Sequence, residues 1–250
     1  MALPLNLESP AAPDAAYIRG MFDRMAARYD TFTALTGFGQ AGRWRARTLE
    51  PLRPGMRVLD LGCGTGDLAL DALRRVGPSG EVVGLDFSEP MLGVLERKYR
   101  CRPSAGLGTL TMVQGRAEDL PLDRRPFDVV VSGFVLRNLY AQIGPILEGV
   151  RRSLRPGGQF RCLDLTEPAH PLLRGVFRGY MLSLVGLYGA MLFGKDYPIP
   201  YLPDSARRFF KAQEFAETLA RAGFTHISAR SFFFGAVTLY HAVNPVAPSS

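Results

Sequence analysis

Short apolar runs alternate with helical stretches from Met56 onward, and each run has the length of a buried strand. Strands that alternate with helices at this spacing predict βαβ units and a mainly parallel sheet covered on both faces. Two later segments, 226–232 and 234–240, predict an antiparallel pair that closes the sheet edge. The first five strands are expected at 58–61, 82–86, 109–114, 127–132 and 160–165, with helices at 68–76, 90–99 and 143–154. The pattern therefore predicts an α/β fold with seven strands.

The rest of the chain divides into one domain with additions. Residues 15–243 are expected to form a single domain, in which 15–50 is a helical cap and 168–211 is an insertion after the fifth strand. Residues 1–14 and 244–250 are rich in Pro, Ala and Ser, which predicts a flexible arm and a flexible tail. The first residues lack a basic region and a continuous apolar core, so no secretory signal is expected.

Composition narrows the class of protein. The chain has 250 residues, of which 47% are hydrophobic and 21% charged, and this excludes a collagen, a coiled coil or a largely disordered chain. Three scattered cysteines and three isolated histidines give no disulfide framework and no metal site, so a reducing, cytoplasmic compartment is expected. The net charge is +7, but the arginines form no basic stripe, and no nucleic-acid partner is expected.

One glycine-rich loop carries the clearest chemistry. The segment 60–66, Asp-Leu-Gly-Cys-Gly-Thr-Gly, directly follows the first strand and precedes a helix. Alternate glycines let a ligand approach the backbone, and the helix start offers free N–H groups. The spacing fits neither a P-loop nor G-x-G-x-x-G, and it looks like the adenosylmethionine loop of class I methyltransferases. Asp86 ends the second strand, where a carboxylate can accept both ribose hydroxyls of an adenosine. S-adenosyl-L-methionine is therefore the expected cofactor.

Other segments make the resemblance more specific. Residues 21–30, 59–68, 134–138, 154–158 and 201–209 resemble the ubiquinone/menaquinone biosynthesis C-methyltransferases (UbiE/MenG-like), over about Tyr17 to Tyr240. Leu136-Arg137-Asn138 and 201–209 are more specific to that family than the glycine loop. The resemblance implies a Rossmann-like class I methyltransferase fold and methyl transfer to a ring carbon of a polyprenylated quinol.

The resemblance and the loop together assign three groups of residues. Arginine stays protonated, so Arg137 is expected to stabilise a phenolate, with Asp164 and Asp30 as candidates to take the proton. Cys63 is expected to be there for its size. The catalytic group is Arg137, Asn138 and Asp164; the substrate group is Asp30, Tyr201 and Arg207; the cofactor group is Tyr29, Asp60, Gly62, Cys63, Gly64, Thr65, Gly66, Asp86, Phe87, Met91, Arg116, Ala117 and Gly133.

Three departures from the family pattern bear on the substrate. Arg116 stands where an acidic or amide side chain would accept from the adenine amino group, and Arg cannot accept. Gly133 and Val135 replace the family's Ser and Gly, and Tyr240-His241 replaces a late His-Arg. These changes leave two alternatives open: a methyltransferase of a specialised metabolite, and an adenosylmethionine-binding protein without methyl transfer, such as a cyclase. An RNA methyltransferase is disfavoured, because no RNA-binding module and no Asn-Pro-Pro-Tyr-type motif is present.

An apolar stretch at 172–193 suggests the kind of partner. Its charge-free part, 179–194, is short for a membrane span and contains glycines. It is interpreted as a buried helix, as a wall for an isoprenoid tail, or as a face that contacts the bilayer. The expected partner is a small hydrophobic aromatic substrate, prenylated if the family substrate is kept. Peripheral membrane contact and a homodimer stay open.

Overall fold

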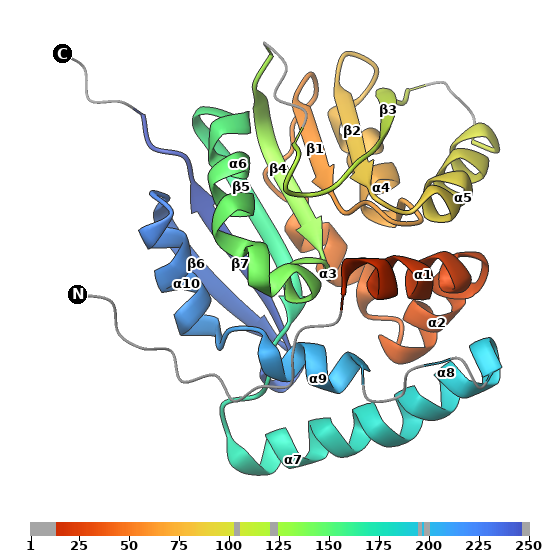
Figure 1. The fold of residues 1–250 in the computed structure, drawn as a ribbon. Coiled ribbons are helices and arrows are strands. Elements are labelled where there is room, and N and C mark those ends of the chain that lie inside the picture. Colours follow the sequence, from red (N-terminus) through yellow and green to blue (C-terminus); the bar gives the residue numbers. More distant parts are fainter. Residues whose placement is uncertain (1–13, 103–105, 121–124, 195–196, 198–200, 247–250) are drawn as a thin grey trace.

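The fold is built on one sheet of seven strands in the order β3-β2-β1-β4-β5-β7-β6 (Figure 1). The computed structural model describes residues 14–102, 106–120, 125–194, 197 and 201–246. Strands β1 to β5 are parallel, whereas β7 is antiparallel to both β5 and β6. This confirms the predicted mainly parallel sheet with an antiparallel pair at one edge. The strands are β1 (Arg57–Leu61), β2 (Glu81–Asp86), β3 (Thr109–Gln114), β4 (Phe127–Gly133), β5 (Leu154–Leu165), β6 (Thr225–Phe232) and β7 (Val237–Val243).

Helices cover both faces of the sheet. The helices α3 (Ala41–Thr48), α4 (Asp67–Val76) and α5 (Glu89–Arg100) pack on one face, and α6 (Ile143–Ser153) and α10 (Ala212–Arg221) on the other. Local sequence fixes where they begin. Ser88 accepts from the Met91 N–H at 3.3 Å and caps α5, as its position after β2 predicts. Gly66 caps α4 in the left-handed conformation, with Asp67 in the first turn.

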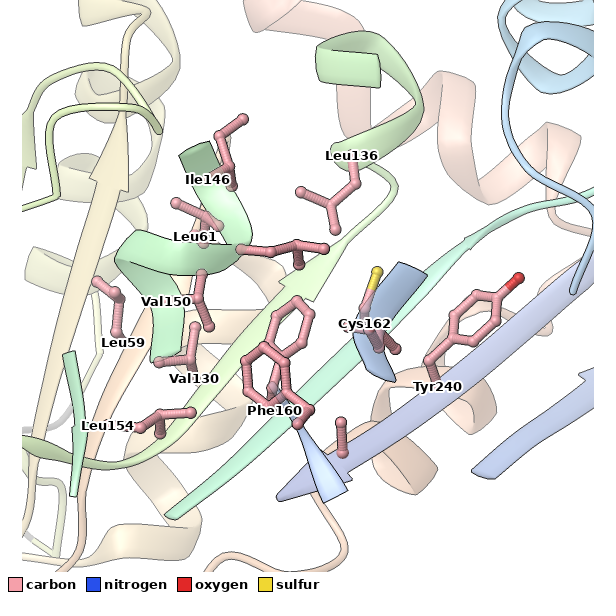
Figure 2. Close-up of a cluster of buried hydrophobic side chains, with 14 of the residues drawn as sticks. Leu59, Leu61, Val130, Leu136, Ile146, Val150, Leu154, Phe160, Cys162 and Tyr240 are labelled. Atoms are coloured by element: carbon pink, nitrogen blue, oxygen red, sulfur yellow. The ribbon is translucent and has the colours of Figure 1, made fainter. Parts of the chain in front are cut away.

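The apolar strands are buried on both sides, which explains why they are apolar throughout. Figure 2 shows one cluster of the hydrophobic core, in which Leu59, Leu61 and Val130 pack against Ile146 and Val150 of α6. The opposite faces of the same strands pack against α4 and α5. Nearly all of the binding chemistry is therefore left to the ends of the strands and the loops that follow them.

A helical cap lies beside the carboxyl ends of the strands. It comprises α1 (Ala15–Met25), η1 (Ala26–Arg28) and α2 (Tyr29–Thr36), and Figure 1 shows it between the sheet and a long helix that forms the far side of the molecule. The cap contacts both neighbours, since η1 packs on α5 and α2 packs on the long helix. The first part of the predicted cap (15–50) thus encloses the space at the strand ends, whereas its last helix, α3, packs on the sheet instead.

The long helix is continuous over three segments, α7 (Pro171–Tyr180), the π-helical η3 (Met181–Val185) and α8 (Gly186–Phe193). It is 23 residues long, and its most apolar stretch of 18 residues has a mean hydropathy of 1.4, with only 28% of that stretch buried. By length and composition alone it could cross a membrane, a property that core helices of other proteins share. The helix matches the apolar stretch expected at 172–193. It is longer than the charge-free part of that stretch, 179–194, because Arg174 and Arg178 lie within the same helix. The remaining elements are α9 (Tyr201–Arg208) and the 3-10 segments η2 (Leu136–Gln142) and η5 (Phe233–Gly235).

Three expected boundaries were wrong. The fifth strand, expected at 160–165, begins already at Leu154 with an irregular start, where the register with β4 shifts between Phe127 and Val129. The last strand begins at Val237 rather than at Phe234, because η5 intervenes. Asn244, expected to open a loose tail, is buried, and its amide donates to the Leu154 carbonyl at 2.9 Å. The expected arm at 1–13 and the tail residues 247–250 lie outside the described residues.

Candidate functional site

A cavity of about 1210 Å³ lies at the carboxyl ends of β1, β2 and β4, under the cap and the long helix. This is the position at which open α/β sheets bind ligands. Of the predicted cofactor group, all members except Gly66 line it. Asp30, Tyr201, Arg137 and Asn138 line it as well, whereas Arg207 and Asp164 do not. The fold thus brings nearly all of the predicted site to one place.

The three glycines of the loop serve two different purposes. All have positive φ, at +72° for Gly62, +53° for Gly64 and +85° for Gly66. A Cβ on Gly62 would lie 2.5 Å from the Val135 side chain, and one on Gly66 would lie 2.0 Å from Leu95. A Cβ on Gly64 would meet nothing within 4 Å. Gly62 and Gly66 therefore serve packing, and Gly64 leaves open space at the cavity wall.

Asp86 links the end of β2 to that loop. Its Oδ2 accepts from the Gly64 N–H at 2.8 Å, and its Oδ1 accepts from the Ser88 N–H at 2.9 Å. Burial raises the pKa of Asp86, and these backbone hydrogen bonds oppose the rise. Each carboxylate oxygen accepts more than one hydrogen bond, so Asp86 can hold the loop and still accept ligand hydroxyls.

Asp60 is a buried carboxyl group that lacks partners. Neither oxygen has a hydrogen bond of normal geometry among the described residues, although the Ala69 N–H lies close enough to lower the pKa somewhat. Burial, and then the charge of Asp86, raise the pKa of Asp60 to about 8. Such a group at a cavity wall is suited to a cationic ligand. Together with Asp86 and the open space at Gly64, it fits S-adenosyl-L-methionine, which joins a nucleoside to a charged amino acid.

The raised pKa of Asp60 predicts a pH-dependent affinity. Below pH 8 the free protein holds this carboxyl largely protonated, and a bound ammonium favours the ionised form. The affinity for S-adenosyl-L-methionine is therefore expected to rise with pH toward 8, by at most about tenfold per pH unit. Calorimetry in two buffers of different ionisation enthalpy would measure the proton released on binding. Asp60→Asn should bind more weakly with a flatter profile; an unchanged profile would assign the dependence to another group, such as Asp86.

Arg137 and Asp164 form a buried ion pair at the cavity floor. The Arg137 Nη1 donates to Asp164 Oδ1 at 2.9 Å, and its backbone N–H donates to Oδ2 at 3.0 Å. Oδ1 also accepts from the Leu165 N–H at 2.8 Å. Burial raises the pKa of Asp164, and the Arg137 charge opposes the rise. Since Asp164 has both oxygens engaged and does not line the cavity, it holds Arg137 in place, and the expectation that it takes a substrate proton is not supported by its placement.

Polar groups of the other elements gather next to Arg137. The Arg137 Nε is buried and has no partner among the described residues. The Tyr201 hydroxyl donates to Asn138 Oδ1 at 2.9 Å, which joins α9 to η2. Burial raises the pKa of the Tyr29 hydroxyl, and the Arg137 charge lowers it. The arrangement can hold an oxyanion of an aromatic ligand beside a fixed positive charge.

Asp30 is occupied by contacts that the sequence did not indicate. Its Oδ1 accepts from the Thr65 hydroxyl at 2.6 Å, and its Oδ2 pairs with Lys98 Nζ at 2.5 Å. Lys98 also pairs with Asp67 at 2.9 Å. In the same way the Ser88 hydroxyl donates to Asp23 of α1 at 2.5 Å. These contacts close the cap onto the cofactor loops, and no local sequence signal marks them, because each joins elements far apart in the chain.

Two predicted residues lie at or beyond the rim. Arg116 lines the cavity, but its guanidinium is half exposed and pairs with Glu118 at 3.1 Å. Arg207 is exposed and pairs with Asp204 at 3.4 Å. Cys63 is buried, and burial raises the pKa of its thiol well above the usual value, which leaves it unreactive.

Known proteins resemble this chain in sequence and in structure. The sequence model of the ubiE/COQ5 methyltransferase family matches residues 11–244. Demethylmenaquinone methyltransferase of Geobacillus kaustophilus is 33% identical over 89% of this chain and 94% of its own length. Ubiquinone/menaquinone biosynthesis C-methyltransferase UbiE of Geobacter sulfurreducens is 36% identical over 89% of this chain and 86% of its own.

Solved structures share the fold at low sequence identity. A SAM-dependent methyltransferase from Aquifex aeolicus superimposes with a TM-score of 0.57 at 18% identity, covering 80% of this chain and 88% of the other. Phosphoethanolamine N-methyltransferase 2 of Haemonchus contortus, solved in complex with S-adenosyl-L-methionine, gives a TM-score of 0.61 at 16% identity, covering 91% and 60%.

Proposed function

The chain belongs to the ubiE/COQ5 methyltransferase family, and from that premise we propose that it methylates a ring carbon of a menaquinone- or ubiquinone-type quinol. It is an S-adenosyl-L-methionine-dependent methyltransferase of the class I fold. The observation that supports a ring substrate is the buried Arg137, which lines an otherwise largely apolar cavity and whose Nε has no partner among the described residues. One named relative is a demethylmenaquinone methyltransferase, and the other is a C-methyltransferase of ubiquinone/menaquinone biosynthesis.

Different residues would bind the cofactor at one end of the cavity and the methyl acceptor at the other. Asp60, Asp86 and the loop around Gly64 would hold the cofactor, which supplies an electrophilic methyl group on a sulfonium. The cap and the long helix limit the access of water to the cavity. The acceptor carbon can therefore be aligned with the methyl group while hydrolysis of the cofactor stays low.

Arg137 acts at the acceptor end. A guanidinium beside a quinol hydroxyl stabilises the phenolate, and a phenolate raises the nucleophilicity of the neighbouring ring carbon. Asp164 fixes the orientation of that guanidinium through two hydrogen bonds. In the net reaction the ring carbon exchanges its hydrogen for the methyl group and the quinol hydroxyl is regained. The one proton released passes to water, since Asp30 is held by Thr65 and Lys98 and Asp164 by Arg137.

The test is methyl transfer by the purified protein. Reduced demethylmenaquinone and S-adenosyl-L-methionine should give a product one methylene heavier, with the new methyl on the ring carbon by mass spectrometry and NMR. Bound cofactor without transfer to either quinol type would contradict the proposal. That outcome would favour a specialised aromatic substrate, because the departures Arg116, Gly133 and Val135 all line this cavity.

The same proposal includes a prenylated substrate and a protein peripheral to the bilayer. The outer face of the long helix supports it, since six large apolar side chains are exposed there: Leu172, Val176, Leu182, Leu184, Leu187 and Met191. Their exposed fractions run from 42% to 72%, so this face has no partner among the described residues. Apolar faces of this kind bury in the outer part of a bilayer.

Charge on this face is expected to detach the protein from membranes. Leu184→Glu and Leu187→Glu should each weaken binding to phospholipid vesicles by about tenfold or more, since a buried leucine contributes about 1.5–3 kcal/mol. Co-sedimentation with vesicles measures this, and Val246→Glu is the control, because Val246 is 68% exposed at the opposite end of the sheet. Turnover of a short-tailed quinol free in solution should stay at the wild-type level. Equal binding of all three variants would exclude the long helix as the membrane face.

A further inference from the structure

Four phenylalanines have an uncommon backbone conformation. Among the described residues, five non-glycine residues have positive φ, and four of them are Phe38 (+47°), Phe134 (+62°), Phe233 (+48°) and Phe234 (+56°). Bulky side chains rarely adopt this conformation, and such strain gathers at functional sites. The four come from three separate loops, so only the fold brings them together.

Their rings form a continuous row with the single tryptophan. Ring centroids are 5.7 Å apart for Phe38 and Phe233, 6.3 Å for Phe233 and Trp44, and 6.3 Å for Trp44 and Phe134. At the outer end Phe38 is 52% exposed and Phe234 76% exposed. Phe233, Trp44 and Phe134 line the cavity. The row therefore leads from the surface into the site.

Both ends of this row meet functional parts of the molecule. At the inner end the Phe134 carbonyl accepts from the Arg137 guanidinium. At the outer end the Phe38 ring stacks on Tyr180 of the long helix, with centroids 5.2 Å apart. The Tyr180 hydroxyl donates to the Thr36 carbonyl at 2.6 Å and fixes this side of the opening. No charged side chain belongs to the row, so it suits a long apolar group and disfavours a polar one.

We propose that this row of rings is the route by which the isoprenoid tail of the substrate leaves the cavity toward the bilayer. The proposal rests on the proposed function and adds where the tail lies. Isoprene units are flat and apolar, and they bury well against aromatic faces without needing hydrogen bonds. With the ring of the quinol at Arg137, the tail would pass Phe134, Trp44 and Phe233 in turn. Phe38 and Phe234 would meet the bilayer beside the long helix.

Trp44 reports on this route without any methyl transfer, because it is the only tryptophan of the chain. Bromine quenches tryptophan fluorescence at short range. A naphthoquinone whose polyprenyl tail is brominated near the ring should quench Trp44 more than the same quinone with an unbrominated tail. Equal quenching by the two would overturn the route, whether or not the protein methylates quinols.

Substitution of Phe233 tests the route by kinetics. Phe233→Asn removes the ring while keeping a residue type that tolerates positive φ. In detergent solution without vesicles, KM for a long-tailed demethylmenaquinol should rise by about tenfold, the effect of losing roughly one aromatic contact. KM for an analogue with a single isoprene unit and kcat for both should change less than about twofold. Val246→Asn, which changes an exposed apolar residue far from the row, is the matched control.

The outcomes separate the two proposals. Equal KM changes for long and short tails would show that Phe233 is structural and would overturn the route while the methyl transfer stands. Absence of transfer by the wild-type protein to either quinol would overturn the proposed function, and the bromine measurement would still decide the route.

Discussion

Arg137→Ala is expected to lower kcat by about 100- to 1000-fold, the usual effect of removing one donor to a developing oxyanion. The same substitution leaves Asp164 buried without its cation, which should lower the free energy of unfolding by about 3–5 kcal/mol. The affinity for S-adenosyl-L-methionine should stay near wild type, because the proposed cofactor contacts of Asp60 and Asp86 are left unchanged. Stopped assays, urea unfolding and calorimetry on one preparation measure all three. A variant that is stable and active would remove Arg137 from the reaction.

A second variant separates catalysis from stability. In Arg137→Ala/Asp164→Asn the unpaired buried charge is gone, so part of the lost stability should return while kcat stays low. Arg137→Lys should recover only part of the rate, because an ammonium lacks the planar two-pronged geometry. Recovery of kcat together with stability in the double variant would indicate that Arg137 is purely structural.

Gly66→Ala should have the largest effect on folding within the glycine loop. A methyl group there would lie 2.0 Å from Leu95 Cδ1, at φ +85° and against a fully buried side chain. Overpacking and the left-handed conformation together should lower the free energy of unfolding by about 2–5 kcal/mol, measured in urea.

Gly64→Ala is the matched control for that loop. Its φ is also positive, at +53°, but no atom lies within 4 Å of the new methyl group. The substitution should lower the free energy of unfolding by only about 1–2 kcal/mol. It should also weaken cofactor binding, because the new methyl group would project into the open space of the cavity beside the hydrogen bond from Gly64 to Asp86. If Gly64→Ala were as unstable as Gly66→Ala, contact with Leu95 would not be the cause.

The local chemistry of the cofactor end could be predicted from the sequence. The glycine loop follows one buried strand, and an acidic residue ends the next. The carboxyl ends of adjacent parallel strands meet at one sheet edge, so the sequence order alone places these two features next to each other. Asp86 and Gly64 therefore lie close together, and the structure adds the hydrogen bond between them, which the motif did not indicate. The resemblance added the family, and the family model supports it over residues 11–244.

The substrate end could be predicted only in part. Arg137 and Asn138 were identified by their triplet, but the role of Asp164 depends on contacts between β5 and η2, which no local pattern encodes. Asp30 was expected at the substrate and is held by Thr65 and Lys98. Arg207 was expected there too, and helix α9 turns it to the solvent.

The sequence by itself determined which loops are expected at the cofactor, which triplet is expected at the acceptor, and that one helix is unusually apolar. These follow from periodicity and from motifs whose residues are neighbours in the chain. Only the tertiary structure decided which side chains from different elements touch. The row from Phe38 through Phe233 and Trp44 to Phe134 spans almost two hundred residues of sequence. Its members meet because three loops and helix α3 pack together at one end of the sheet. Packing of side chains between distant elements has no period that a single sequence can reveal.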